Sequence, residues 1–126
     1  MTSPPAGALR LVNRTRGAVL ADRVQRAERM RDRLRGLLGR AAMTDGEALA
    51  IVPCRSIHTF FMKFPIDALF LDRGGRVLRA LAELPPWRAT RIHPGAAQVV
   101  ELPAGTVART GTREGDELAF EIRAEV

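Results

Sequence analysis

The sequence contains few of the residues that build disulfide-bonded, metal-binding or membrane-spanning proteins. Among its 126 residues are one cysteine, two histidines, one tryptophan and no tyrosine. A single cysteine excludes an internal disulfide bond and fits a reducing compartment. No apolar run approaches the roughly 20 residues that cross a bilayer, and the N-terminus lacks the apolar core of a signal peptide. These absences favour a cytoplasmic protein with no transmembrane segment.

Motifs that hold cofactors are also absent from the sequence. It has no GxGxxG or GKS/T loop for phosphate, because Gly74-Gly75 is expected to form a hairpin turn. It has no pair of cysteines or histidines at the spacing of a zinc site. We therefore expect no cofactor and no metal ion.

Positive charge is plentiful but unevenly distributed. The formal net charge is +6, and 19 of the 20 basic residues are arginine. Residues 1–63 carry 12 basic and 5 acidic side chains, whereas residues 64–126 carry 8 and 9. This asymmetry is compatible with an anionic partner, such as nucleic acid or a membrane surface. It is equally compatible with the arginine-rich composition of proteins from GC-rich genomes.

The start of the chain is predicted to form a frayed end and then a hairpin. Residues 1–7 are rich in proline and glycine, so the single domain should span residues 8–126. Two strand-like pieces, residues 8–13 and 17–22, flank a short polar turn and can pair with each other.

A helix is expected next, because the apolar spacing changes at Arg23. Asp22 is the predicted N-cap and Gly39 the predicted stop. The apolar face of this amphipathic helix, which should dock on the sheet, comprises Met30, Leu34, Leu37 and Leu38.

The rest of the chain is predicted to form short strands joined by turns. The expected strands are residues 48–52, 57–62, 68–71, 76–81, 98–102 and 117–122. A long ordered loop with three prolines is expected at residues 83–96. Short strands without βα alternation favour antiparallel pairing. We therefore expect an α+β domain: a small, mostly antiparallel, β-barrel-like sheet with one main amphipathic helix.

The segment 54–72, CRSIHTFFMKFPIDALFLD, concentrates the reactive side chains. Cys54, His58 and Met62 stand four residues apart, which on a helix would place them together. Branched and aromatic neighbours favour extended backbone instead, where this spacing separates side chains by about 13 Å. One ion cannot join ligands so far apart, so this geometry argues against a metal site.

A cysteine enzyme is the first alternative. Cys54 could form a thiolate–imidazolium pair with His58 or His93, and Asp67 or Glu101 could orient the ring. A lone cysteine is more often a small buried hydrophobic residue. The sequence therefore leans against catalysis and assigns no catalytic residue.

Two acidic residues lie within apolar strand-like runs. Asp67 is at a predicted strand start, where we expect its carboxylate to accept hydrogen bonds from backbone N–H groups of the preceding turn. Glu101 should face the same side as Val99, and its burial would require a partner such as Arg88 or Arg91.

Nucleic-acid binding is the second alternative. At 100° per residue, the predicted helix would carry a basic stripe formed by Arg26, Arg29, Arg33 and Arg40. Arginines also border docked apolar faces by laying their stems along them, and docking explains the stripe more simply.

The ordered motifs of the chain resemble those of domain-of-unknown-function family 192. The resemblance rests on the segment 54–72 together with RGLLGR at 35–40, LPPWR at 84–88, VVELPAG at 99–105 and Gly115-Asp116. Many members have Phe-Trp-Met-Lys-Asn-Thr where this chain has FFMKF at 60–64, so Phe61 replaces a tryptophan. The resemblance implies a compact β-rich fold with a helix, and it brings no activity, substrate or cofactor.

We therefore expect a non-enzymatic domain that binds a small molecule or a protein through the segments 54–67 and 84–95. The candidate ligand-binding residues are Cys54, His58, Met62, Asp67, Trp87, Arg88, His93 and Glu101. The loop around Trp87 either caps the end of the barrel or walls a ligand site. The hypothesis depends on whether the two segments meet.

Overall fold

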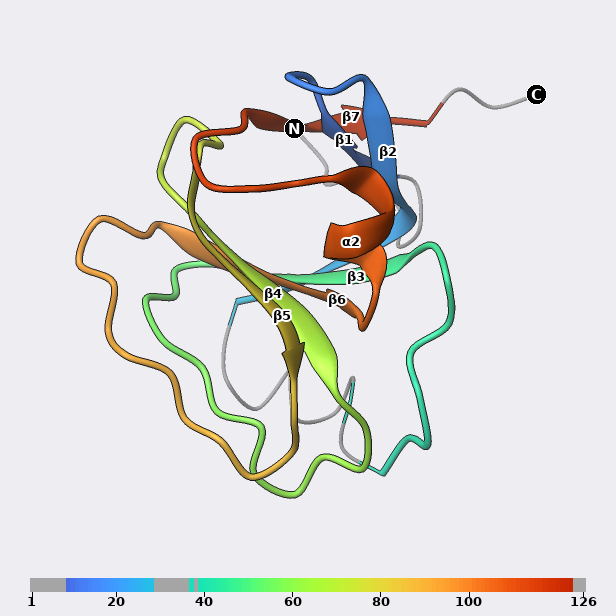
Figure 1. Cartoon of the computed structure of the whole chain (residues 1–126), viewed down its shortest axis with the longest axis vertical. Coiled ribbons are helices and arrows are strands. Elements are labelled where there is room, and N and C mark those ends of the chain that lie inside the picture. The colour runs from blue at the N-terminus through green and yellow to red at the C-terminus, as the bar shows by residue number, and fades with distance from the viewer. Residues whose placement is uncertain (1–8, 29–36, 38, 124–126) are drawn as a thin grey trace.

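The computed structural model describes residues 9–28, 37 and 39–123, which form a curled sheet with one short helix (Figure 1). The elements are β1 (Leu9–Asn13), β2 (Ala18–Ala27), β3 (Glu47–Ile51), β4 (Ile66–Leu71), β5 (Val77–Leu84), β6 (Gln98–Pro103), α2 (Thr106–Thr110) and β7 (Leu118–Ile122). Along the sheet the order is β5-β4-β6-β3-β2-β1-β7.

The strand pairs confirm the predicted α+β class and its mostly antiparallel sheet. β1 and β2 form the expected hairpin, and β7 adds to the other side of β1. β4 lies antiparallel between β5 and β6, and β6 pairs antiparallel with β3. β2 and β3 are parallel instead. Parallel neighbours need a long crossover, and residues 28–46 supply it.

The sheet curls into a half-barrel because the two edge strands meet at one end. The N–H of Val77 donates to the carbonyl of Asp116 at 2.8 Å, and the N–H of Leu118 donates to the carbonyl of Gly75 at 2.9 Å. Gly75 has φ 92°, and a Cβ there would overlap the carbonyl oxygen of Leu118. Only glycine permits both this conformation and this close approach.

A buried polar cluster stabilises this closed end. Asp116 accepts hydrogen bonds from Arg16 Nε at 2.7 Å, Asn13 Nδ2 at 2.9 Å and the N–H of Arg113 at 3.1 Å. Burial by itself would raise the pKa of the Asp116 carboxyl, but these hydrogen bonds and the Arg16 charge outweigh it and lower the pKa below 3.8. The carboxylate therefore joins β1 and its turn to the segment that precedes β7.

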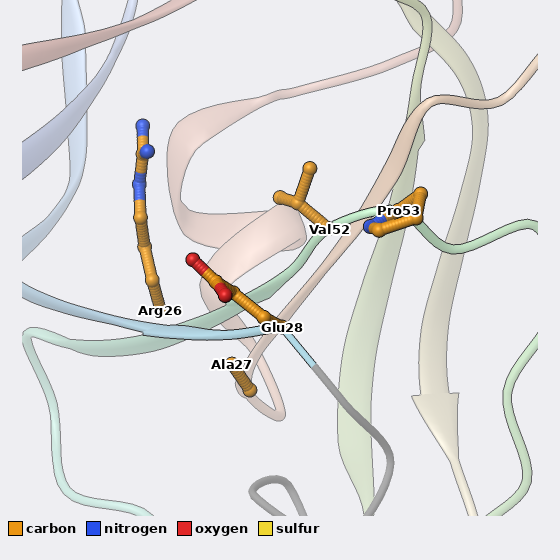
Figure 2. Close-up of a pocket in the computed structure, with 5 residues that line it drawn as sticks. All are labelled: Arg26, Ala27, Glu28, Val52 and Pro53. Carbon is orange, nitrogen blue, oxygen red and sulfur yellow. The ribbon is translucent and has the colours of Figure 1, made fainter.

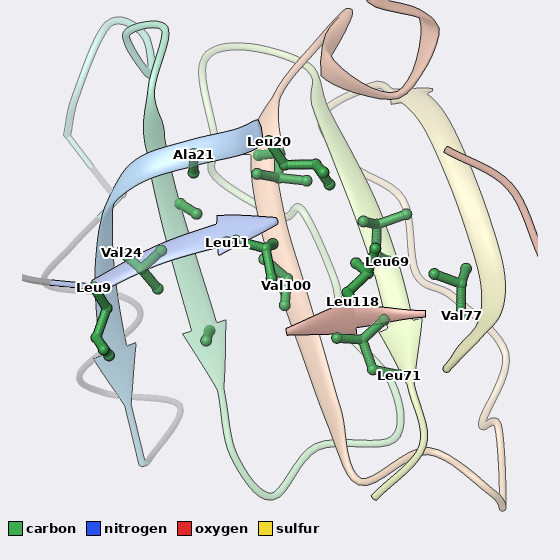
Figure 3. Packing of buried hydrophobic residues seen from close by; sticks show 13 residues of the cluster. Leu9, Leu11, Leu20, Ala21, Val24, Leu69, Leu71, Val77, Val100 and Leu118 are labelled. Carbon is green, nitrogen blue, oxygen red and sulfur yellow. The ribbon is translucent and has the colours of Figure 1, made fainter. Parts of the chain in front are cut away.

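The sheet packs apolar side chains on both faces. All seven strands contribute to the interior cluster, which includes Leu11, Leu69 and Val100 (Figure 3). The outer cluster covers β3, β4 and β6 with loop side chains, among them Ile57 and Met62. Successive residues of β4 alternate between the two clusters, so the whole strand is buried. This explains why every residue of β4 except Asp67 is apolar.

The predicted start of the helix is wrong. Asp22 is not an N-cap, because β2 continues through it to Ala27 and pairs with β3. Val24 packs into the interior cluster and Ala27 into the outer cluster, so apolar residues three apart serve opposite faces. A shift of register between β1 and β2 adds a further break in the alternation. Together they hide the strand alternation of β2, whereas the helical spacing was predicted from Met30, Leu34, Leu37 and Leu38, beyond the end of this strand.

The rest of the predicted helix lies largely outside the described residues. This applies to Met30, Leu34 and Leu38 and also to Arg29 and Arg33. Leu37 is described, and it is buried in the outer cluster.

Residues 57–62 are also not the predicted strand. His58 forms an isolated antiparallel bridge with Ala89, and the chain then turns through Phe61 at φ 67°. The segment is therefore extended only up to Thr59, outside the sheet, and then turns at Phe60 and Phe61.

The helix α2 was not predicted, because five residues are too few to show a helical period. Left-handed glycines, Gly105 and Gly111, bound it, and it contacts β2 and β5. No helix in the described part of the chain is long and apolar enough to cross a bilayer.

Candidate functional site

The two predicted segments meet. Residues 52–65, which connect β3 to β4, run beside residues 85–97, which connect β5 to β6, at the lower left of Figure 1. Backbone hydrogen bonds join them from base to end: Cys54 N–H to Ala97 O at 3.2 Å, His93 N–H to Arg55 O at 2.9 Å and Thr90 N–H to Ile57 O at 2.9 Å. We call residues 52–65 and 85–97 the paired loops.

Thr59 fastens the far end of the paired loops. Its N–H donates to Arg88 O at 2.8 Å, and its carbonyl accepts from Trp87 N–H at 3.0 Å. Its hydroxyl donates to Pro85 O at 2.6 Å and accepts from Arg88 N–H at 3.0 Å. The side chain is fully buried. Thr59 alone therefore joins the two loops here, where paired strands would use a ladder of backbone hydrogen bonds.

Aromatic side chains gather at this end and face solvent. The exposed fraction is 67% for Phe61, 56% for Trp87 and 38% for Phe60. The ring centroids of Phe61 and Trp87 are 4.7 Å apart, and those of Phe60 and Trp87 are 6.1 Å apart. His58 stacks on Phe60 at 4.9 Å. We call Phe60, Phe61, Trp87 and His58 the aromatic tip.

The tip is held in a costly backbone conformation. Phe61 has φ 67° and Trp87 has φ 64°, a region that side chains larger than glycine rarely adopt. Each such residue costs about 1–3 kcal/mol, and it persists only where its surroundings enforce it. The hydrogen bonds to Thr59 supply that constraint. Residues strained in this way cluster at functional sites, which makes the aromatic tip a candidate site.

The charged side chains of the paired loops are all basic. Lys63 and Arg88 neighbour the aromatic tip in the sequence, and Arg55 and Arg91 lie farther back on the loops; all four are exposed. Neither loop contains aspartate or glutamate. The surface therefore combines exposed aromatic rings with an excess of positive charge.

The predicted site residues within the paired loops fall into two groups. His58, Trp87 and Arg88 are at the tip, whereas Met62 is buried beneath it in the outer cluster. The tip therefore draws on both predicted segments, with Met62 behind its surface.

The remaining two candidates of the loops lie toward their base. Cys54 is half-buried, and its thiol donates to the carbonyl of Ser56 at 3.0 Å. The ring of His93 packs on Phe70, with centroids 4.3 Å apart. The catalytic role considered for Cys54 stays a hypothesis without further support from these contacts.

Asp67 holds backbone in place, but not the backbone that we predicted. It lies fully buried in β4, and its two oxygens accept from the N–H groups of Glu83 and Val107, both at 2.8 Å. The preceding turn was the predicted donor, and this was wrong because the side chain reaches across the sheet. The carboxylate joins the end of β5, where Glu83 has φ 53°, to the start of α2.

Glu101 lies at the centre of the sheet, fully buried in β6. It is opposite Leu49 of β3 and Ala68 of β4, on the face of the outer cluster. Arg88 and Arg91, the expected partners, are exposed on the paired loops. Glu101 and Asp67 thus face opposite sides of the sheet.

The arginine stripe is not a continuous surface in the described residues. Arg26 lies on β2, not on a helix, with its guanidinium 5.8 Å from the centroid of the Phe120 ring. Arg40 forms an ion pair with Glu47 at 2.8 Å. The stripe was inferred from a helical period that β2 does not follow.

A cavity lies beside Arg26, at the base of the paired loops (Figure 2). Its volume is about 380 Å³, and its walls are Arg26, Ala27, Glu28, Val52 and Pro53. A second cavity, of about 370 Å³, lies by Arg109 and the start of β2. Neither contains a residue of the aromatic tip. Across the described ranges, no three histidine, cysteine or acidic side chains are grouped to hold a metal ion.

Sequence reasoning missed the residues that build the tip, namely Thr59, Phe60, Phe61 and Lys63. A usable signal was present: two consecutive phenylalanines on an extended segment cannot both face the core. That alternation predicts one exposed ring, and the exposure of both depends on the positive φ of Phe61.

Residues 11–120 match DUF192, a family described as "Uncharacterized ACR". The chain belongs to DUF192. The resemblance drawn from the motifs is thereby confirmed. A protein of Thermococcus sibiricus named UPF0127 protein is 34% identical over 123 residues, covering 91% of this chain and 77% of its own length. A UPF0127 protein of Thermococcus gammatolerans is 28% identical, covering 89% of this chain and 75% of its own length.

Two crystal structures have the DUF192 chain's fold. A Sinorhizobium meliloti protein, described as a "putative transcription regulator", matches with a TM-score of 0.73 and 25% identity over 89% of this chain and 91% of its own. A protein of unknown function from Novosphingobium aromaticivorans matches with a TM-score of 0.74 and 22% identity over 94% and 91%. The second likeness concerns the fold alone.

Proposed function

We propose that this DUF192 domain is a non-enzymatic binding module whose contact surface is the aromatic tip with Lys63 and Arg88. The observation that supports it is the exposure of large aromatic rings on a strained, hydrogen-bonded scaffold. Tryptophan and arginine dominate the energetics of protein-binding surfaces. A scaffold that is rigid before binding loses little entropy on association.

Photocrosslinking tests this proposal without requiring that the partner be known. The photoreactive residue p-benzoylphenylalanine replaces Phe61, whose ring it resembles, in cells that produce the protein. The matched control carries it at Ile122, which is 73% exposed on β7. Irradiation should yield adducts at position 61 that are absent at position 122, whether the adduct is protein, lipid, nucleic acid or a small molecule. Equal or absent labelling at both positions would contradict a binding role for the tip.

Nucleic acid is a second candidate partner. The observation in its favour is the description of the Sinorhizobium meliloti protein as a "putative transcription regulator", together with the basic surface of the paired loops. Exposed aromatic and basic side chains also build surfaces for single-stranded nucleic acid. A single-stranded oligothymidylate at low salt should then quench the fluorescence of Trp87, and unchanged emission would count against this candidate.

A further inference from the structure

We infer that the aromatic tip docks on the surface of an anionic lipid bilayer, with the rings of Phe61 and Trp87 entering the interface. This inference rests on the proposed function and names its partner. It is carried by three properties of the tip: its apolar rings, its internally bonded backbone and its charge.

The first property is the projection of apolar rings at the end of the molecule. The tip belongs to the paired loops, which extend beyond the start of β4 and the end of β5 (Figure 1). Phe61 and Trp87 are its most exposed rings. Tryptophan is enriched at the membrane–water interface, because its ring is apolar and its N–H is polar.

The second property is that the N–H groups of Phe60, Trp87 and Arg88 bond within the tip. Backbone N–H groups that enter a lipid environment must find partners within the protein. At the tip, Trp87 and Met62 donate to the carbonyl of Thr59, and Arg88 donates to its hydroxyl. Phe60 donates to the ring of His58 at 3.3 Å. The adjacent Pro85-Pro86 has no N–H to satisfy.

The same arrangement disfavours nucleic acid. Backbone donors already bonded within the tip are not offered to phosphates or base edges. The rings also pack against one another, so their faces are partly covered. His58 stacks on Phe60, and Phe61 packs against Trp87 at an interplanar angle of 58°. A stacking platform would instead present open ring faces to successive bases.

The third property is charge complementarity with an anionic surface. Lys63 and Arg88 flank the rings, and Arg55 and Arg91 follow on the same loops. The acidic residue nearest to the tip in the sequence is Glu83, at the end of β5. Each cation close to an anionic bilayer strengthens binding about five-fold. The tip therefore matches anionic lipid and not a neutral bilayer.

Trp87 itself provides the assay, because it is the chain's single tryptophan and there is no tyrosine. The intact protein is titrated with vesicles of phosphatidylcholine alone or with 30% phosphatidylglycerol. We expect a saturable blue shift with the anionic vesicles, weakened by salt, and none with the neutral vesicles. No shift with anionic vesicles, or an equal shift with both, would overturn the inference.

Two variants locate the contact. Lys63→Glu with Arg88→Glu should weaken binding at least about 25-fold, as two cations near the bilayer are lost. The matched control reverses Arg73 and Arg113, both exposed at the opposite, closed end of the sheet. Each reversal removes two units of charge, so both double variants carry +2 in place of +6. Equal weakening by the control would refute a contact at the tip.

A third variant tests ring insertion. Phe61→Asn keeps a residue that tolerates positive φ, removes the ring and should weaken binding about ten-fold. Unchanged binding would contradict insertion of this ring.

The failure of the inference is distinct from the failure of the proposed function. If Trp87 responds to oligothymidylate and not to anionic vesicles, the lipid assignment falls and the tip binds nucleic acid. If vesicles have no effect while position 61 still crosslinks to a protein, the lipid assignment falls and the binding module stands.

Discussion

Removing the hydroxyl of Thr59 should loosen the aromatic tip while leaving the sheet folded. Thr59→Val is nearly isosteric, so it preserves packing and the backbone bonds of residue 59. It deletes the bond donated to Pro85 O and the bond accepted from Arg88 N–H, at 2.6 and 3.0 Å. The Pro85 carbonyl and the Arg88 N–H then each lose a hydrogen-bond partner inside the paired loops.

The expected cost follows from those two bonds. Each buried bond contributes about 0.5–1.5 kcal/mol net, and more when its partner is left unsatisfied. Pro85 and Arg88 are exposed residues, so water replaces part of the hydrogen bonding that the Pro85 carbonyl and the Arg88 N–H lose. We expect the tip to open more easily by about 1–3 kcal/mol, which corresponds to roughly five- to a hundred-fold in the opening equilibrium.

Amide hydrogen exchange measures this opening at the Arg88 N–H. Exchange there should accelerate by that factor in Thr59→Val, while amides of β4 and β6 keep their protection. Thr59→Ser is the control: it keeps the hydroxyl and loses one methyl group, at about 0.8 kcal/mol. Its Arg88 amide should exchange within about four-fold of the wild-type rate. Wild-type exchange in Thr59→Val would refute the role assigned to the hydroxyl.

Two further predictions concern the closed end of the half-barrel. Because the folded-state pKa of Asp116 is lowered, its stabilisation is present above about pH 4 and is lost as the pH falls through that lower value. Asp116→Asn should therefore unfold about 2 kcal/mol more easily in urea at pH 7, and its deficit should shrink as the pH falls through the lowered pKa of Asp116; a constant deficit would contradict the linkage to Arg16. Gly75→Ala should lose more than about 2 kcal/mol in the same assay, because its Cβ would overlap Leu118 O, whereas Gly74→Ala should change stability by less than 1 kcal/mol. Equal effects of the two substitutions would show that the close approach at Gly75 is relieved at little cost.

The sequence was a good guide where local patterns and packing agree. The hairpin of β1 and β2, the strands β4, β5, β6 and β7, and the proline-rich loop after β5 all lie close to their predicted positions. The turn before Gly75 is marked by Asp72-Arg73-Gly74, and Asp72 Oδ1 accepts from Gly74 N–H at 2.9 Å. Such features depend on residues within a few positions of one another.

The sequence misled where one segment serves two environments. The helix was predicted to begin at Asp22, but β2 continues to Ala27 and buries Val24 on one face and Ala27 on the other. Periodicity assumes that one face is buried and the other is solvated, and β2 does not meet that condition. The predicted arginine stripe is wrong at Arg26 for the same reason, because Arg26 lies on the strand β2 and not on a helix.

The candidate site was predicted in its parts but not in its arrangement. Trp87 and Arg88 were named from their loop, and His58 from the segment 54–67. Phe61 was noted only as a replacement, because nothing in its neighbours reveals the positive φ that turns it outward. Asp67 was expected to bond backbone, and it does, but its donors Glu83 and Val107 are 16 and 40 residues away.

The sequence by itself determined the family, the α+β class and most strands, because apolar patterns and turn residues act over short distances. Tertiary structure alone decided that the two loops lie side by side, that Thr59 joins them and that the aromatic rings face outward. Those features depend on hydrogen bonds between residues about 30 positions apart. Their partners are chosen by the curvature of the sheet, which no local pattern encodes.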